Sequence, residues 1–273
     1  MATDINLGRK ISYGLGDFGL HLFFLTASLY LLYYYTDVMG LKPATAGWVF
    51  AAALIWDAII DPVVGGLANR TRSRWGRYRP FLLISAIPLS ASWIIIFIPT
   101  NLTGVSLVVF AAAAHILFRT VYTFAAMPYL ALMAAMTQNS TMRSSLAAFR
   151  MFSAACAGIF VAFATLELVE VFGGDQIGFL RVAMLYSAVA ALLLILVFAT
   201  SREEVDVDAL KMPSFADMGR MLRSNTAFWL VCGALLAGSM ANVFFNKTIP
   251  YFFQYALDRQ DLIGPALGVL TGL

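Results

Sequence analysis

Two aspartates, Asp57 and Asp61, interrupt an otherwise apolar run of the chain. Four residues apart on a helix, their carboxylates lie on the same face about one turn from each other. Two carboxylates that share a site repel each other, so at least one is protonated or the pair holds a cation. Such a pair suits a site that takes up and releases H⁺ or Na⁺. The alternative is that arginines inside the membrane neutralise the pair, which then only fixes helix packing.

A second pair of ionisable residues lies in the first apolar run of the chain, residues 11–36. Asp17 and His21 are also one turn apart on a shared face. Histidine titrates near neutral pH, so His21 could bind a substrate or relay a proton, or it could be an interior group with satisfied hydrogen bonds. Arg150 lies about one turn inside the fifth run, 146–169. Lys247 lies in the outer part of the seventh apolar run, residues 226–252.

One arginine lies near the middle of an apolar run. Arg119 belongs to the fourth run, and Tyr122 follows it by about one turn. An arginine beside Asp57 or Asp61 would satisfy both buried charges without any substrate, and we expect this structural role for Arg119. A contact of Arg119 and Tyr122 with substrate is the alternative.

The elements that must hold these residues are membrane-spanning helices. Of the 273 residues, 61% are hydrophobic and 12% are charged, which is too little polar surface for a soluble domain of this length. A bilayer is crossed by a helix of about 20 apolar residues. Runs of this kind lie at 11–36, 45–69, 80–99, 104–134, 146–169, 178–200 and 226–252. We therefore expect an all-α membrane protein.

A polar connector divides these runs into two groups. We expect residues 1–200 to form a six-helix bundle, 201–225 a connector, and 226–273 a seventh helix with the start of an eighth. This is the layout of a transporter built from two six-helix halves, so the chain is expected to be part of a longer protein. Within the connector, Ser214 and Asp217 resemble a capping box before a short amphipathic helix. A disordered acidic linker is the alternative.

Lysine and arginine residues are distributed unequally between the two ends of the predicted helices. One side holds Arg9, Lys10, Arg70, Arg72, Arg74, Arg77, Arg79, Arg143, Arg202, Lys211, Arg220 and Arg223, and the other holds Lys42, Arg181 and Arg259. Because cytoplasmic loops are rich in Lys and Arg, this pattern places the N-terminus in the cytoplasm. The first run has no cleavage signal after it, so it is expected to stay as a helix of a bacterial inner-membrane protein.

The loop after the second run resembles the cytoplasmic signature of the major facilitator superfamily. It reads Gly-Gly-Leu-Ala-Asn-Arg-Thr-Arg over 65–72 and Arg-Trp-Gly-Arg-Tyr-Arg-Pro over 74–80. The resemblance implies that the loop steadies one gating state by pairing its charges with neighbouring helix ends. The gating residues would be Arg70, Arg72, Arg74, Gly76, Arg77 and Arg79. Asn69 stands where the superfamily usually has an aspartate, which weakens one of the expected ion pairs.

Three further segments resemble the glycoside–pentoside–hexuronide:cation symporter family, which includes the melibiose permease. They are Ser-Tyr-Gly-Leu-Gly-Asp-Phe-Gly at 12–19, Tyr-Tyr-Tyr-Thr-Asp at 33–37 and Trp-Asp-Ala-Ile-Ile-Asp-Pro at 56–62. Pro-Tyr-Phe-Phe at 250–253 continues the match. The resemblance implies a monomeric, twelve-helix, two-bundle fold that transports a small molecule by alternating access to a central cavity, with no cofactor, no nucleic-acid partner and no catalytic residues.

The resemblance also implies a cation site. In the permease, the cation lies between two aspartates, an asparagine and a threonine, and the corresponding positions here are Asp57, Asp61, Ile60 and Thr123. Isoleucine cannot coordinate Na⁺, whereas a pair of carboxylates can still carry a proton. We therefore expect H⁺ to be favoured over Na⁺ as the coupling ion, with no other metal.

The sugar site of the permease is conserved only in part. Its two acidic positions correspond to His21 and Ala126, its tryptophan to Leu130, and only its arginine persists, as Arg150. The cavity has lost two acids and can gain positive charge from Arg119 and Lys247. A positively biased pocket favours an anionic substrate, so a hexuronide is our expectation among glycosides.

Two other classes of membrane protein share features of this sequence. Prenyltransferases of the membrane also carry two aspartates one turn apart, but they need a second aspartate-rich helix, which the other runs do not supply. A carrier of lipid-like or other non-sugar amphiphiles shares the fold, and it would have an apolar cleft between its halves instead of a hydrated pocket. We expect a sugar symporter and not an enzyme.

Overall fold

The computed structural model describes residues 5–204, 224–259, 262, 265–266 and 269. The described part forms two units, one that ends near residue 205 and one that follows it. Six helices of the first unit are long and apolar enough to cross a membrane. The predicted all-α membrane fold is thereby confirmed, and the predicted surface helix near Ser214 lies outside the described residues.

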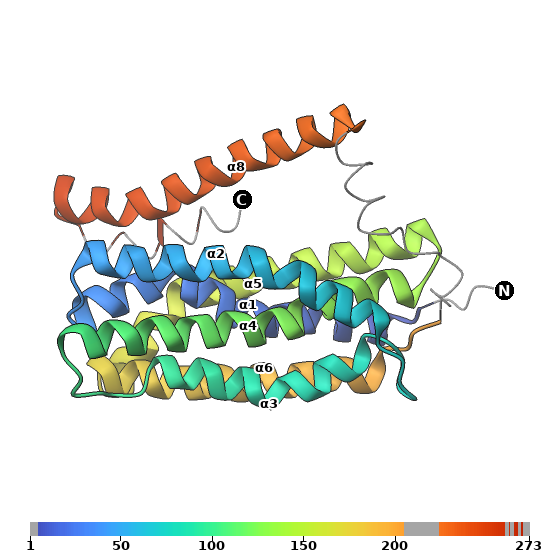
Figure 1. Cartoon of the computed structure of the whole chain (residues 1–273), viewed down its shortest axis with the longest axis horizontal. Coiled ribbons are helices and arrows are strands. Elements are labelled where there is room, and N and C mark those ends of the chain that lie inside the picture. Colours follow the sequence, from blue (N-terminus) through green and yellow to red (C-terminus); the bar gives the residue numbers. More distant parts are fainter. Residues whose placement is uncertain (1–4, 205–223, 260–261, 263–264, 267–268, 270–273) are drawn as a thin grey trace. The chain divides into compact units, whose positions relative to one another are not determined.

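The first unit consists of six helices that run side by side (Figure 1). They are α1 (Leu7–Tyr33), which continues into the π-helical turn η1 (Tyr34–Val38), α2 (Pro43–Arg70), α3 (Arg79–Ile96), α4 (Gly104–Met136), α5 (Ser140–Val171) and α6 (Asp175–Thr200). The second unit contains α8 (Thr226–Tyr251) and the π-helical turn η3 (Phe252–Ala256). All seven expected helices are present, with ends that differ from the predicted ones by a few residues.

The largest difference is at the start of α5, six residues before the predicted one. The Asn139 side chain accepts hydrogen bonds from the backbone N–H groups of Thr141 and Met142, at 2.9 and 3.3 Å. These groups have no partner inside the helix, so an asparagine cap stabilises the early start. Polar residues can therefore extend a membrane helix beyond its apolar run.

Helix α1 packs against both α5 and α6, and its glycines allow the close approach. A methyl group at Gly14 would lie 2.8 Å from the carbonyl oxygen of Phe149 in α5. One at Gly19 would lie 3.2 Å from the Cα of Ala190 in α6. Small residues let membrane helices pack backbone to backbone. The segment 12–19 is thus a packing motif as well as a family signature.

The other helix pairs of the unit are α2 with α4, and α3 with both α4 and α6. Large apolar side chains such as Ile84 and Ile87 on α3 are 68% and 76% exposed. Exposed apolar residues of this kind suit a surface that faces lipid. Trp93, Phe97 and Phe118 form an aromatic cluster inside the unit, with Trp93 4.9 Å from Phe97 and 4.7 Å from Phe118 between ring centroids.

Candidate functional site

A row of polar contacts joins α2 to α4. Asp57 forms an ion pair with Arg119, with 3.0 Å between Oδ2 and Nη1. One turn further, Thr123 donates a hydrogen bond of 2.8 Å to Oδ1 of Asp61. Both helices present their polar groups at a spacing of four residues, so two successive turns of one helix meet two successive turns of the other. The two aspartates therefore lie together, but each has a different partner.

The ion pair is largely removed from solvent. The side chain of Arg119 is 12% exposed and that of Asp57 is 21% exposed. Among the described residues, Oδ1 of Asp57 and Nε of Arg119 are buried and have no hydrogen-bond partner. A buried ion pair is strongly destabilised when one member is removed, because the other charge is left without compensation. The predicted pairing of Arg119 with an aspartate of the second helix thus agrees with the geometry.

The two polar contacts lie in a cavity of about 260 Å³. Its lining residues are His21, Phe24, Asp57, Asp61, Arg119, Tyr122, Thr123, Ala126, Met127 and Leu130. Phe24 and Tyr122 stack with their ring centroids 6.4 Å apart and their planes 25° apart. The cavity therefore combines an aromatic wall with two carboxylates and one guanidinium, a mixture that is typical of sites for polar small molecules.

His21 joins this cavity to a second polar cluster on α1. Its Nδ1 lies 2.9 Å from the backbone carbonyl oxygen of Asp17 and 3.5 Å from that residue's carboxylate. A carbonyl oxygen can only accept, so the shorter contact requires the proton on Nδ1 and makes Nε2 an acceptor when the ring is neutral. Asp17 is buried, and Arg150 interacts electrostatically with both Asp17 and Tyr13. Neither Asp17 nor Arg150 lines the cavity.

Comparison with known proteins identifies the protein family of this chain. Residues 12–273 match the family described as MFS/sugar transport protein. The chain belongs to this family. Its members similar to this chain include transporters of the melibiose permease-like group, so the expected family membership is confirmed.

Three relatives illustrate the group. The chain is 33% identical to the inner membrane symporter YicJ of Escherichia coli, over 85% of this chain and 50% of that protein. It is 28% identical to the isoprimeverose transporter of Lactiplantibacillus pentosus, over 96% of this chain and 56% of the relative. It is 27% identical to the glucuronide carrier protein homolog of E. coli, over 92% and 56%. The chain thus spans little more than half the length of the relatives it matches.

The family's signature loop is held at the start of α3 by a residue that the sequence analysis missed. The carboxylate of Glu203 accepts hydrogen bonds from the backbone N–H groups of Arg77, Tyr78 and Arg79, at 2.8, 2.8 and 3.0 Å. Gly76 adopts a φ of +108°, and a methyl group there would lie 2.6 Å from the Glu203 carboxylate. A carboxylate at a helix N-terminus is favourable because the exposed N–H groups carry partial positive charge.

The arginines of the loop differ in their contacts. Arg79 donates two hydrogen bonds to the carbonyl oxygen of Phe198 near the end of α6, at 2.7 and 3.2 Å, and one to Trp75. Arg74 lies over the Trp75 ring, 4.6 Å from its centroid. Asn69, which replaces the usual aspartate, accepts a 2.6 Å bond from the hydroxyl of Tyr78. Burial raises the pKa of the Tyr78 phenol, so it remains a donor at neutral pH.

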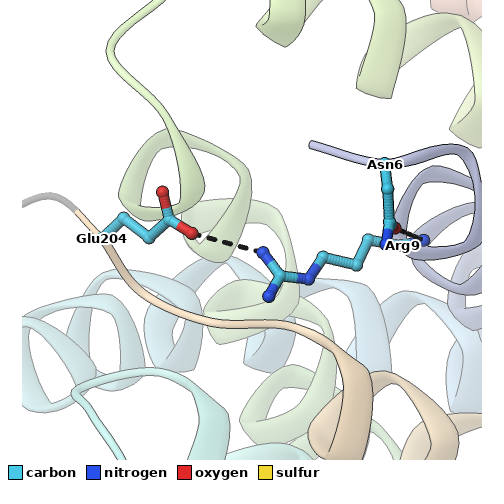
Figure 2. A network of polar contacts seen from close by, with 3 residues as sticks. All are labelled: Asn6, Arg9 and Glu204. Atoms are coloured by element: carbon cyan, nitrogen blue, oxygen red, sulfur yellow. Dashed lines mark hydrogen bonds and ion pairs between the residues drawn. The ribbon is translucent and has the colours of Figure 1, made fainter. Parts of the chain in front are cut away.

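The residue after Glu203 makes a second connection at this end of the bundle. Glu204 pairs with Arg9 of α1 at 3.2 Å, and the side chain of Asn6 caps α1 by accepting from the backbone N–H of Arg9 (Figure 2). The backbone N–H of Glu204 donates to the carbonyl oxygen of Ala135 in α4, at 3.0 Å.

His115 is a further polar residue that the sequence analysis did not select. It lies on α4 one turn before Arg119 and is fully buried. Its ring meets the edges of Phe50 and Tyr35, with centroids 4.9 and 6.0 Å away. Neither ring nitrogen has a hydrogen-bond partner among the described residues. The substrate role of Lys247 stays a prediction, since its side chain lies outside the described part of the chain.

Proposed function

We propose that the full-length protein is a symporter that couples the transport of a glycoside or uronide to the movement of H⁺. The observation that carries the proposal is the arrangement of Asp61 with Thr123 and of Asp57 with Arg119 in one cavity. A carboxylate that can change its charge next to a substrate cavity is what ion coupling requires. The names of the relatives, which include an isoprimeverose transporter and a glucuronide carrier homolog, support a sugar derivative as substrate.

Three features support H⁺ over Na⁺ as the coupling ion. Ile60 supplies no oxygen ligand at the position where the resemblance places an asparagine. One oxygen of Asp57 is held by Arg119, and one oxygen of Asp61 is held by the hydroxyl of Thr123. A proton needs only one carboxylate oxygen, whereas Na⁺ needs several oxygen ligands at once.

The charge of the cavity bears on the choice between a neutral glycoside and a hexuronide. The expectation of an anionic substrate rested on positive charge from Arg119 and Lys247. The charge of Arg119 is compensated by Asp57, and Arg150 does not line the cavity. A neutral glycoside therefore suits the described cavity wall better than a hexuronide. Stacking of a sugar on Phe24 or Tyr122 is compatible with either substrate.

We further propose that the protein is a monomer in the bacterial inner membrane with its N-terminus in the cytoplasm. The distribution of arginine supports this orientation, because Arg9 and the arginines of the loop lie at the same end of the bundle as Glu203 and Glu204. In this orientation the signature loop faces the cytoplasm.

Transport by proteoliposomes of the full-length protein tests the proposal. Neutral glycosides and their uronides are supplied with an inward H⁺ gradient, an inward Na⁺ gradient or neither. We expect accumulation of a glycoside only with the H⁺ gradient, together with alkalinisation outside. Asp61→Asn is expected to abolish accumulation, with Ser90→Ala on α3 as a control outside the cavity. Accumulation that survives in both Asp57→Asn and Asp61→Asn would refute the coupling role of the pair.

A further inference from the structure

The position of Arg119 has a consequence for ion selectivity. Its guanidinium lies in the cavity and contacts Oδ2 of Asp57 at 3.0 Å, at the carboxylate pair to which the resemblance assigns a cation. A guanidinium is charged under all physiological conditions, so this positive charge is permanent. The described structure thus already provides one cation for the two aspartates.

We propose that Arg119 determines the coupling-ion specificity of the transporter, by acting as a built-in cation that occupies Asp57 and excludes Na⁺. The inference rests on the proposed function and adds to it the residue that selects the ion. Among the described residues, Asp61 is hydrogen-bonded to Thr123 and Asp57 is the aspartate that pairs with Arg119, so Asp61 is then the carboxylate that remains for the transported ion.

The exclusion has an electrostatic cause. The guanidinium already compensates the charge of Asp57, so a Na⁺ ion between the two aspartates would be attracted by the charge of Asp61 alone. The same ion would lie next to the guanidinium, and like charges repel strongly at short range where little water screens them. The side chain of Arg119 is only 12% exposed, so solvent screening is weak. Arg119 cannot lose its charge to relieve the repulsion.

The exclusion also has a coordination cause. Oδ2 of Asp57 is occupied by the guanidinium, and the hydroxyl hydrogen of Thr123 points to Oδ1 of Asp61. At position 60, isoleucine offers only carbon to an ion. Removal of Arg119 would release Asp57, and an asparagine at position 60 would restore an amide oxygen.

The other charged and titratable groups near Arg119 do not supply the same function. His115 and Tyr122 lie about one turn from Arg119 on α4, before and after it, and neither side chain carries a permanent charge. His21 lines the same cavity from α1 but is engaged with Asp17. Within the described cavity wall, Arg119 is therefore the residue with a permanent positive charge.

Three variants of the full-length protein test the inference. Arg119→Met removes the charge and keeps much of the side-chain volume. Arg119→Met combined with Ile60→Asn also adds an oxygen ligand. Arg119→Lys keeps a positive charge and is the matched control. Each is compared with the wild type for sugar uptake driven by an inward Na⁺ gradient at equal pH on both sides, with K⁺ in place of Na⁺ as the reference.

We expect no stimulation by Na⁺ in the wild type or in Arg119→Lys. The double variant is expected to gain stimulation of about 10-fold, within the range of typical coupling between two ligands. Stimulation of the wild type by Na⁺ would overturn the inference. The inference would also be overturned if the double variant reaches the membrane and binds sugar but its sugar uptake is not stimulated by Na⁺.

A second measurement does not depend on transport. Thermal unfolding of purified protein in detergent is followed in NaCl and in KCl at equal ionic strength, because a ligand that binds the folded state raises its melting temperature. A rise specific to Na⁺ is expected only for the variants without a charge at position 119. If the wild type moves no sugar under any gradient, the proposed function fails, while this measurement still decides the role of Arg119. A Na⁺-specific rise in the wild type contradicts that role even where no variant can be purified.

Discussion

Replacement of Glu203 by glutamine removes a charge from the start of α3 and leaves the side-chain length unchanged. The carboxylate accepts three backbone hydrogen bonds, from Arg77, Tyr78 and Arg79. Glutamine keeps one acceptor oxygen, but its NH₂ group then faces at least one of these N–H donors. At least one hydrogen bond and the favourable charge at the helix N-terminus are lost together.

The magnitude follows from these contacts. A hydrogen bond to a charged group contributes about 1.5–3 kcal/mol, and a charge at a helix terminus about 0.3–1 kcal/mol. Because Glu203 is half-buried, we take a loss near the lower end, about 2 kcal/mol. For a unit of this size, 1 kcal/mol corresponds to about 2–4 °C in melting temperature, which gives a fall of about 4–8 °C.

The assay is thermal unfolding of the full-length protein in detergent, followed by tryptophan fluorescence. Trp75 is a reporter near the change, since its ring meets Phe198 edge-on at 5.7 Å. Glu204→Gln is the matched control, because its ion pair with Arg9 is partly exposed and such pairs contribute about 0–1 kcal/mol. Equal melting temperatures for Glu203→Gln and Glu204→Gln would refute the role of Glu203 as the residue that holds the loop.

Other substitutions probe separate parts of the structure by the same unfolding assay. Gly76→Ala is expected to cost about 1–3 kcal/mol, because the residue has a positive φ and its methyl group would press on Glu203; a melting temperature equal to that of the wild type would contradict this. His115→Phe is expected to raise the melting temperature, since a buried imidazole that has no hydrogen-bond partner within the described part of the chain costs about 1–3 kcal/mol and the surroundings are aromatic; a lower value would mean that the ring nitrogens are bonded. Gly14→Val should destabilise the α1–α5 contact by about 1–3 kcal/mol through overpacking against Phe149, and unchanged stability would show that the helices can separate without loss.

The helices could be predicted because their apolar runs are continuous and the bilayer fixes their length. Their ends were harder to predict, as the early start of α5 shows, because the cap at Asn139 is polar and lies outside the apolar run. The ion pair of Arg119 with an aspartate could also be anticipated, since two opposite buried charges at similar depth satisfy each other. Which aspartate Arg119 contacts depends on the register of α2 against α4, and this register could not be predicted from the residue pattern.

The sequence was least informative where a residue acts through backbone groups. Glu203 belongs to a polar connector, and nothing in its local pattern indicates that it meets a loop more than one hundred residues earlier. His115 was missed although it lies four residues before Arg119, because a single histidine inside an apolar run does not by itself indicate a function. The family resemblance supplied the position of Thr123, which composition alone would not have selected.

Two consecutive acids shortly after the end of α6, Glu203 and Glu204, determine how a mechanical force on the chain would spread through the six-helix unit. Glu203 accepts hydrogen bonds at the beginning of α3. Glu204 forms an ion pair with Arg9 at the beginning of α1, and its backbone N–H donates a hydrogen bond near the end of α4. A force applied to the chain just after residue 204 therefore acts on four helices: on α6 through the chain itself, and on α1, α3 and α4 through these contacts. In the alternating-access cycle of the proposed symporter, the unit is therefore expected to tilt as one body with its internal packing preserved.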